Sequence, residues 1–196
     1  MAPPKINPIL HWSGRAFLWL VGWRLVGDAR QYPKSVIIAA PHTSNWDFVY
    51  GVAIAYSLNI KFHFVAKDSL FRWPVGYVFR KMGGIPVNRH ERKNAVHQMV
   101  DIFNERETLV LAIAPEGTRR RVDYWKTGFY YIALEAQVPI LLGFFDYERK
   151  VGGIGPHLFP TGDIEADMQR IHDFYKDKKG KNPESFGTIQ IRPASH

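Results

Sequence analysis

Short apolar runs that alternate with helical stretches constrain the fold of this chain more than any other feature of its sequence. The strand candidates are SVIIAA (35–40), KFHFVAK (61–67), IPVNR (85–89, or an extended loop), TLVLAIA (108–114), PILLGFFD (139–146) and TIQIR (188–192). Helical patterns occupy 47–58, 69–82, 92–105, 127–136 and 164–178. Continuous apolar runs are typical of strands that are buried on both faces. The alternation therefore predicts an α/β fold: a single domain with a central, mostly parallel mixed sheet flanked by helices.

The bulk composition fits one folded domain. The chain has 196 residues, 46% of them hydrophobic, which is enough for one sizeable core. It contains no cysteine, so a disulfide framework and a cysteine metal site are excluded, and a reducing compartment fits. The formal net charge of +8 favours anionic partners such as lipid headgroups, nucleic acid or phosphorylated small molecules. The basic run KDKKGKN (176–182) is expected to be a solvated loop.

Residues 1–30 are interpreted as an N-terminal amphipathic segment, followed by a domain that spans residues 31–196. The stretch AFLWLVGWRLVG (16–27) is shorter than the roughly 20 apolar residues of a spanning helix and lacks signal-peptide flanks, so we expect neither. Trp12, Trp19 and Trp23 fall at helical spacing and would share one face. This pattern is typical of an amphipathic helix at a membrane interface, and equally of a first helix packed on the core.

Three polar clusters directly follow strand candidates. They are PHTSNWD (41–47), the region of Arg89, and PEGTRRR (115–121). In open α/β sheets, ligands bind beyond the carboxyl ends of the strands. We therefore expect the three clusters to meet at one edge of the sheet and to form the functional site there.

His42 and Asp47 admit two interpretations. With Ser44 as the N-cap of the following helix, His42 lies in the entering loop and Asp47 can reach back toward it. Ser44 and Asp47 then resemble a capping box, which needs no histidine. The alternative is a catalytic pair, because a carboxylate on one ring nitrogen fixes the tautomer and leaves the other nitrogen free to accept a proton. The spacing alone leaves both interpretations open.

The segment PEGTRRR supplies a second group of candidates. Glu116 ends an apolar run, Gly117 permits a tight turn, and Thr118 and Arg119 supply hydrogen-bond donors. Guanidinium groups suit bidentate binding of phosphate. Lys126 would add a cation at the start of the next helix. A solvated basic turn would explain the same residue types.

Other chemistries lack a signature in this sequence. It has no GxSxG elbow, no Walker phosphate loop, no GxGxxG and no HExxH. A metal site built from His42, Asp47 and His63 is not expected.

Four stretches, taken in order, resemble the motifs of the glycerolipid acyltransferase family, whose members acylate glycerol-3-phosphate and lysophosphatidic acid. The matches are His42 to Asp47, Ile85 to Arg89, Glu116 to Arg119, and Val138 to Ile140. They span roughly residues 35–146, most of the chain. A single HxxxxD is a weak signal, whereas four ordered motifs are specific.

The resemblance implies an acyltransferase with the glycerol-3-phosphate acyltransferase-like fold. His42 would act as general base on the acceptor hydroxyl, and Asp47 would orient the imidazole and stabilise its charged form. Arginines of the second and third motifs would bind the phosphate of the acceptor. The implied substrate-binding residues are Arg89, Glu116, Gly117, Thr118, Arg119 and Lys126.

The resemblance also implies the partners of the reaction. The donor would be an acyl thioester, either acyl-CoA or acyl carrier protein, and the acceptor a lysophospholipid, foremost 1-acylglycerol-3-phosphate, in phospholipid biosynthesis. No cofactor, metal or nucleic acid is implied, and the expected location is the cytoplasmic face of the membrane, as a peripheral protein. The alternatives are acyl transfer to another lipid hydroxyl, a non-catalytic module that binds anionic lipid or nucleic acid, and a thioesterase-like hydrolase.

Overall fold

The fold is built on a seven-stranded sheet, seen in a computed structural model that describes residues 6–67, 71–73, 75–87 and 92–192. The strand order across the sheet is β1-β7-β6-β2-β5-β3-β4. The strands are β1 (Arg24–Val26), β2 (Lys34–Ala40), β3 (Phe62–Lys67), β4 (Gly84–Val87), β5 (Leu109–Ile113), β6 (Ile140–Asp146) and β7 (Val151–Leu158). The pair β6–β7 is antiparallel, and the other neighbouring pairs are parallel. The expected mostly parallel mixed sheet is confirmed.

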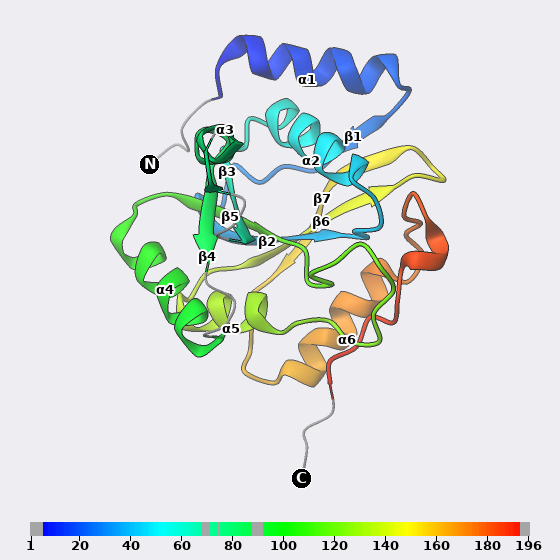
Figure 1. The fold of residues 1–196 in the computed structure, drawn as a ribbon. Helices are drawn as coiled ribbons and strands as arrows, with labels where there is room; N and C mark the ends of the chain where they lie inside the picture. Colours follow the sequence, from blue (N-terminus) through cyan, green and yellow to red (C-terminus); the bar gives the residue numbers. More distant parts are fainter. Residues whose placement is uncertain (1–5, 68–70, 74, 88–91, 193–196) are drawn as a thin grey trace.

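Helices cover both faces of this sheet. They are α1 (Pro8–Leu20), α2 (Trp46–Ser57), α3 (Val75–Lys81), α4 (Arg92–Glu105), α5 (Gly128–Glu135) and α6 (Ile164–Tyr175). Figure 1 shows α1, α2 and α3 on one side of the sheet and α4, α5 and α6 on the other. Since both faces are covered, the central strands are apolar along their whole length.

The alternation of side chains along β2 shows how the two cores are divided. Val36 and Ile38 are fully buried in the larger cluster, which also holds Phe103 of α4 and Phe129 of α5. Ile37, between them, belongs to a second cluster on the opposite face, together with residues of α2 and the turn after it. A strand places successive side chains on opposite faces, so one apolar run supplies both cores.

The N-terminal helix α1 packs on α2 at close range. A Cβ at Gly14 would lie 2.7 Å from the Ala53 carbonyl oxygen, so this approach requires glycine. The expected face of three tryptophans is wrong, because the helix ends at Leu20. Trp12 and Trp19 are 66% and 78% exposed, whereas Trp23 lies beyond the helix and is buried. The helix is therefore packed on the core and also carries exposed tryptophans.

Several expected elements need correction. The segment 188–192 is not a strand: the Gln190 carbonyl accepts the Trp125 N–H, and Ile189 is buried in the larger cluster, which explains the alternating pattern without a ladder. The expected helix 69–82 is observed as α3 alone, with residues 71–73 in a turn and 68–70 and 74 outside the described residues. Strands β1 and β7 were not expected, and the helix 164–178 ends at Tyr175.

Glycines allow β1 and β7 to pair closely, and this pairing yields a stability prediction. Gly153 has φ +151°, and a Cβ there would lie 1.9 Å from the Val26 carbonyl oxygen. We expect Gly153→Ala to lower the free energy of unfolding by about 3 kcal/mol or more, because backbone must move to relieve the clash. Gly128→Ala, at the start of α5 with no atom within 4 Å of its Cβ, is the matched control and should be neutral or slightly stabilising. Urea denaturation measures both, and equal midpoints would contradict the prediction.

Candidate active site

The site forms where three neighbouring strands end. In the order β6-β2-β5 the three strands are parallel, so the turns that follow them meet at one edge of the sheet. The turn after β2 carries His42, the turn after β5 carries Glu116, and β6 is followed by Tyr147. The sequence predicted that the turns carrying His42 and Glu116 would meet here, but it did not predict Tyr147.

Asp47 is the most thoroughly bound side chain of the site, with 1% of its surface exposed. Its Oδ2 accepts the backbone N–H groups of Thr43 and Ser44, each at 2.7 Å. The same oxygen lies 3.4 Å from Nδ1 of His42. The carboxylate therefore reaches back over the turn, as the spacing allowed, and faces both the helix entrance and the imidazole.

The structure describes the capping of this turn and the approach of His42 to Asp47, while catalysis by this pair stays a prediction. The cap position differs from the expectation: Asn45 is the N-cap of α2, its side chain makes no cap hydrogen bond, and Ser44 Oγ accepts the Trp46 N–H at 3.2 Å. Asp47 supplies the cap-like acceptor for the turn, and His42 lies beside it with 22% of its side chain exposed. With Nδ1 turned toward Asp47, Nε2 is the ring nitrogen left to meet a substrate.

Glu116 supports the turn from the end of β5. Its carboxyl oxygens accept the His42 backbone N–H at 3.1 and 2.9 Å, and the residue is 4% exposed. Burial raises the pKa of Glu116 to about 8, the Asp47 charge adds to this rise, and the His42 N–H opposes it. Glu116 thus contacts the backbone of His42 rather than open solvent.

The remaining predicted residues lie in and beside the turn after β5, where Arg119, Arg120 and Lys126 form a basic rim. Gly117 has φ +67°, and a Cβ there would lie 2.6 Å from Nζ of Lys126, whose side chain crosses this turn. Thr118 Oγ1 accepts the Arg120 N–H at 3.3 Å. Arg119 is exposed and lines the same groove as His42. Arg89 lies outside the described residues, so its place in the site stays a prediction.

A groove of about 2230 Å³ opens at this edge of the sheet. Its lining includes the apolar side chains of Phe48, Phe64, Val65, Phe79, Met99 and Ile113. The cationic side chains of Arg119, Arg120 and Lys126 belong to the same lining, and so does His42. Such a combination of apolar walls with a few polar groups is typical of a ligand site.

Two features of the site were missed from the sequence. Tyr147 donates its hydroxyl to Oδ1 of Asp47 at 2.7 Å. The segment 176–182, expected to be a solvated loop, packs against the turn: Asn182 donates its backbone N–H to Thr43 Oγ1 at 3.2 Å and its Nδ2–H to the Thr43 carbonyl at 2.9 Å. Tyr147 directly follows an expected strand, so the rule that selected His42 and Glu116 would also have selected it.

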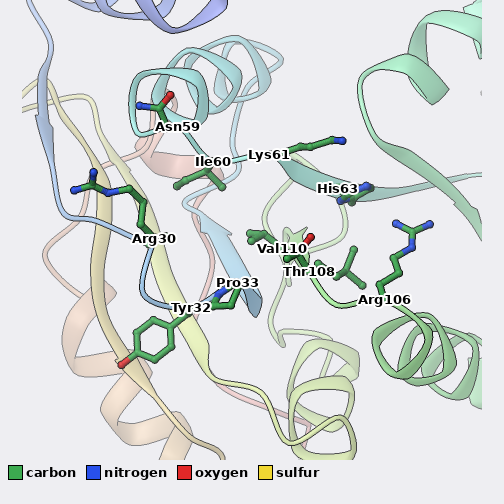
Figure 2. Close-up of a pocket in the computed structure, with 12 residues that line it drawn as sticks. Arg30, Tyr32, Pro33, Asn59, Ile60, Lys61, His63, Arg106, Thr108 and Val110 are labelled. Carbon is green, nitrogen blue, oxygen red and sulfur yellow. The ribbon is translucent and has the colours of Figure 1, made fainter. Parts of the chain in front are cut away.

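A second, smaller pocket of about 230 Å³ lies at the opposite edge, where β2, β3 and β5 begin. Figure 2 shows Lys61, His63 and Arg106 along one wall and Arg30 across from them. Burial lowers the pKa of His63, and the charges of Arg106 and Lys61 lower it further. Because His63 lines this pocket at the opposite edge of the sheet, it is remote from His42 and Asp47. No cluster of three metal-binding side chains occurs in the part of the chain that the structure describes.

Comparisons with known proteins give a relative by sequence and a similar fold. The chain is 30% identical over 141 residues to the human 1-acyl-sn-glycerol-3-phosphate acyltransferase beta, an alignment that covers 68% of this chain and 50% of that relative. The chain thus spans about half the length of this curated relative. The fold resembles the crystal structure of the 1-acyl-sn-glycerophosphate acyltransferase PlsC from Thermotoga maritima, with a TM-score of 0.58, 16% identity, and coverage of 88% of this chain and 80% of that one.

The family model named Acyltransferase matches residues 24–141, which is more than half of the chain. That range contains the HxxxxD turn, the Arg89 segment and the EGTR turn. It confirms the resemblance that the ordered motifs gave, and the chain belongs to the Acyltransferase family.

Proposed function

We propose that this protein transfers a fatty acyl group from an acyl thioester to a hydroxyl of a lysophospholipid, foremost 1-acylglycerol-3-phosphate, in phospholipid biosynthesis. The observation that carries the proposal is the pair His42–Asp47 on the lining of a groove with apolar walls and a basic rim. Support for the acceptor comes from the two relatives named above, which are acyltransferases of 1-acylglycerol-3-phosphate.

The reaction needs one general base. In the proposed step, Nε2 of His42 takes the proton of the acceptor hydroxyl while its oxygen attacks the thioester carbonyl carbon. The carbon–sulfur bond then breaks, and the leaving thiolate takes the proton from the imidazolium. Asp47 stabilises the imidazolium, which is the role of the carboxylate in a catalytic triad. Base catalysis typically contributes about 10²–10⁴-fold, so alignment of the two substrates in the groove must supply much of the remaining acceleration.

The two substrates can be assigned to parts of the groove by their chemistry. The phosphate of the acceptor suits Arg119 and Lys126, and Arg89 by its sequence position. The apolar wall suits hydrocarbon chains. The donor is proposed to be acyl-CoA or acyl carrier protein, and no cofactor takes part in the proposed step.

We propose that the protein binds the membrane surface through α1, from the cytoplasmic side. Four apolar side chains of this helix are largely exposed: Ile9 (77%), Trp12 (66%), Trp19 (78%) and Leu20 (73%). Figure 1 shows α1 as the outermost helix on its side of the sheet. Exposed tryptophans on one helix face are typical of interfacial helices. Among the described helices, none has the length and apolar character needed to cross a bilayer.

The first prediction concerns the catalytic pair. We expect His42→Ala to lower kcat by about 10²-fold or more, because the base is lost. Asp47→Asn should lower kcat similarly while keeping the fold. The amide oxygen of the new side chain can still accept the Thr43 N–H, and its amide N–H can donate to the Tyr147 oxygen. His157→Ala, on the distant strand β7, is the control and should be fully active.

The assay combines purified protein, labelled acyl-CoA or acyl carrier protein, and a panel of lyso-lipids, with the products identified by mass. Acyl chains recovered on the lipid support the proposal. Free fatty acid alone would instead indicate a hydrolase. Lipid binding without thiol release would indicate a non-catalytic module, and full activity of both variants would exclude the proposed base.

The second prediction concerns the protonation of Glu116. Its folded-state pKa of about 8 lies above the ordinary value of 4.5, so the folded protein holds this proton more tightly than the unfolded chain does. The resulting stabilisation is complete below about pH 4.5 and is lost as the pH rises through about 8. We expect the free energy of unfolding to fall by a few kcal/mol across this window, and Glu116→Gln to remove that fall.

Urea denaturation at several pH values measures the slope for each variant. Glu148→Gln, at an exposed position beside the site, is the matched control and should retain the slope of the wild type. The glutamine at 116 keeps an oxygen that can accept the His42 N–H, so the turn should remain intact. The same slope in wild type and Glu116→Gln would refute the prediction.

The third prediction concerns the membrane surface. We expect the double variant Trp12→Glu with Trp19→Glu to sediment less with vesicles that contain anionic phospholipid, because two exposed aromatic anchors are replaced by charges. The two substitutions leave the core contacts of Leu18 and Trp23 intact, whereas a deletion of the N-terminal segment would remove them. Phe159→Glu, at another exposed apolar side chain, is the control. Unchanged sedimentation of the double variant would show that α1 does not bind the membrane.

A further inference from the structure

We propose that Tyr147 is a positioning residue that fixes the Asp47 carboxylate and moderates its effect on His42. The inference deepens the proposed function and rests on it. Tyr147 lies 100 residues from Asp47 in the sequence, just beyond the end of β6, and donates its hydroxyl to Oδ1 at 2.7 Å. No motif of the family resemblance contains this residue.

The two oxygens of Asp47 have different partners. Oδ2 accepts the N–H groups of Thr43 and Ser44 and faces the His42 ring, whereas Oδ1 accepts the Tyr147 hydroxyl. Bonds on both oxygens prevent the carboxylate from rotating about its Cβ–Cγ bond. A buried carboxylate also requires donors, and a hydroxyl is a strong, short donor to an ionised oxygen. Tyr147 therefore holds the orientation in which Oδ2 meets the imidazole.

Packing holds the tyrosine itself in place. Its ring meets Trp23 edge-on, with centroids 4.9 Å apart, and Tyr50 of α2 at 5.4 Å. Trp23 and Tyr50 stack on each other at 4.2 Å. The Tyr147 backbone N–H donates to the Lys179 carbonyl at 2.9 Å. The hydroxyl is thus positioned from three separate parts of the chain.

The protonation of Tyr147 suits a permanent donor. Burial raises the pKa of its hydroxyl well above the ordinary value of 10.0, and the hydrogen bond to Asp47 and the Asp47 charge raise it further. The titratable groups that interact with Asp47 or Tyr147 are Glu116 after β5 and Tyr50 in α2, and Glu116 in turn raises the pKa of Tyr175 in α6. Replacing Tyr147 by Phe changes none of these groups, so the variant isolates the hydroxyl.

A hydroxyl on Oδ1 draws negative charge away from the imidazole. Without it, the carboxylate should stabilise the imidazolium more strongly, so that the base loses its proton at a higher pH. We expect Tyr147→Phe to move the acid limb of the kcat/KM profile upward by about half a pH unit. We also expect kcat at neutral pH to fall about tenfold, because the carboxylate can rotate, while KM stays within about twofold.

The control is Tyr32→Phe. Tyr32 also makes a hydroxyl hydrogen bond, to Nε2 of His157, but it lies at the opposite edge of the sheet. We expect this variant to keep both the wild-type kcat and the wild-type pH profile. Thermal unfolding of each variant verifies that it is folded before the kinetics are compared.

A measurement without substrate separates this inference from the proposed function. The His42 ring titration, followed by NMR and assigned through its absence in His42→Ala, should shift to higher pH in Tyr147→Phe. An unchanged midpoint would overturn the inference even if the wild type is an acyltransferase. A loss of kcat with an unchanged midpoint would show a structural role only and would overturn it as well. A midpoint that shifts in Tyr147→Phe, while the wild type transfers no acyl group, would leave the inference about Asp47 standing and refute the proposed function.

Discussion

The buried carboxylate of Asp47 is the interaction on which the rest of the site depends. A carboxylate with 1% of its surface exposed loses the stabilisation of water and must find donors in the protein. It finds them in the turn that precedes its own helix and in a tyrosine from the far end of β6. The conformation of the HxxxxD turn is therefore set by the need to solvate one charge. The histidine lies beside Oδ2 of this carboxylate and itself lines the groove.

Two carboxyl groups share this site, and their environments differ. Within the described part of the chain, Asp47 accepts hydrogen bonds from three donors, whereas Glu116 accepts one from the His42 N–H and is 4% exposed. Like charges at short range separate the pKa values of such pairs, and the one with fewer donors takes up the proton. Burial and the Asp47 charge accordingly raise the pKa of Glu116 to about 8. In the proposed reaction Asp47 would stabilise the imidazolium, and Glu116 accepts the backbone N–H of the same histidine.

Local signals in the sequence were sufficient for five of the seven strands, β2 to β6, and for half of the site. The strand β2 and the helix α4 were predicted because their apolar patterns are long and regular, and the meeting of His42 with Glu116 followed from parallel strands that end at one edge. The strand β7 contains three glycines and a proline beside only two β-branched residues, Val151 and Ile154, so its sequence does not have the pattern of a strand and it was missed. TIQIR has the alternation of a strand, but Ile189 is buried without a ladder, which only the tertiary packing decides. Tyr147 and Asn182 are 100 and 139 residues away from their partners, so no local pattern contains their contacts.

The same long-range contacts explain why the N-terminal segment belongs to the domain physically. Trp23 lies just beyond the end of α1 at Leu20, and it packs against both Tyr50 and Tyr147. Tyr147 in turn binds the carboxylate that faces His42. Leu18 of α1 shares a core cluster with Trp23, so a helix whose outer face exposes two tryptophans is linked to the HxxxxD turn through Trp23 and Tyr147. Because each of these contacts is made by a buried or half-buried side chain, the segment cannot be treated as an appendage to a self-sufficient site: the packing that fixes α1 also fixes the donor of Asp47.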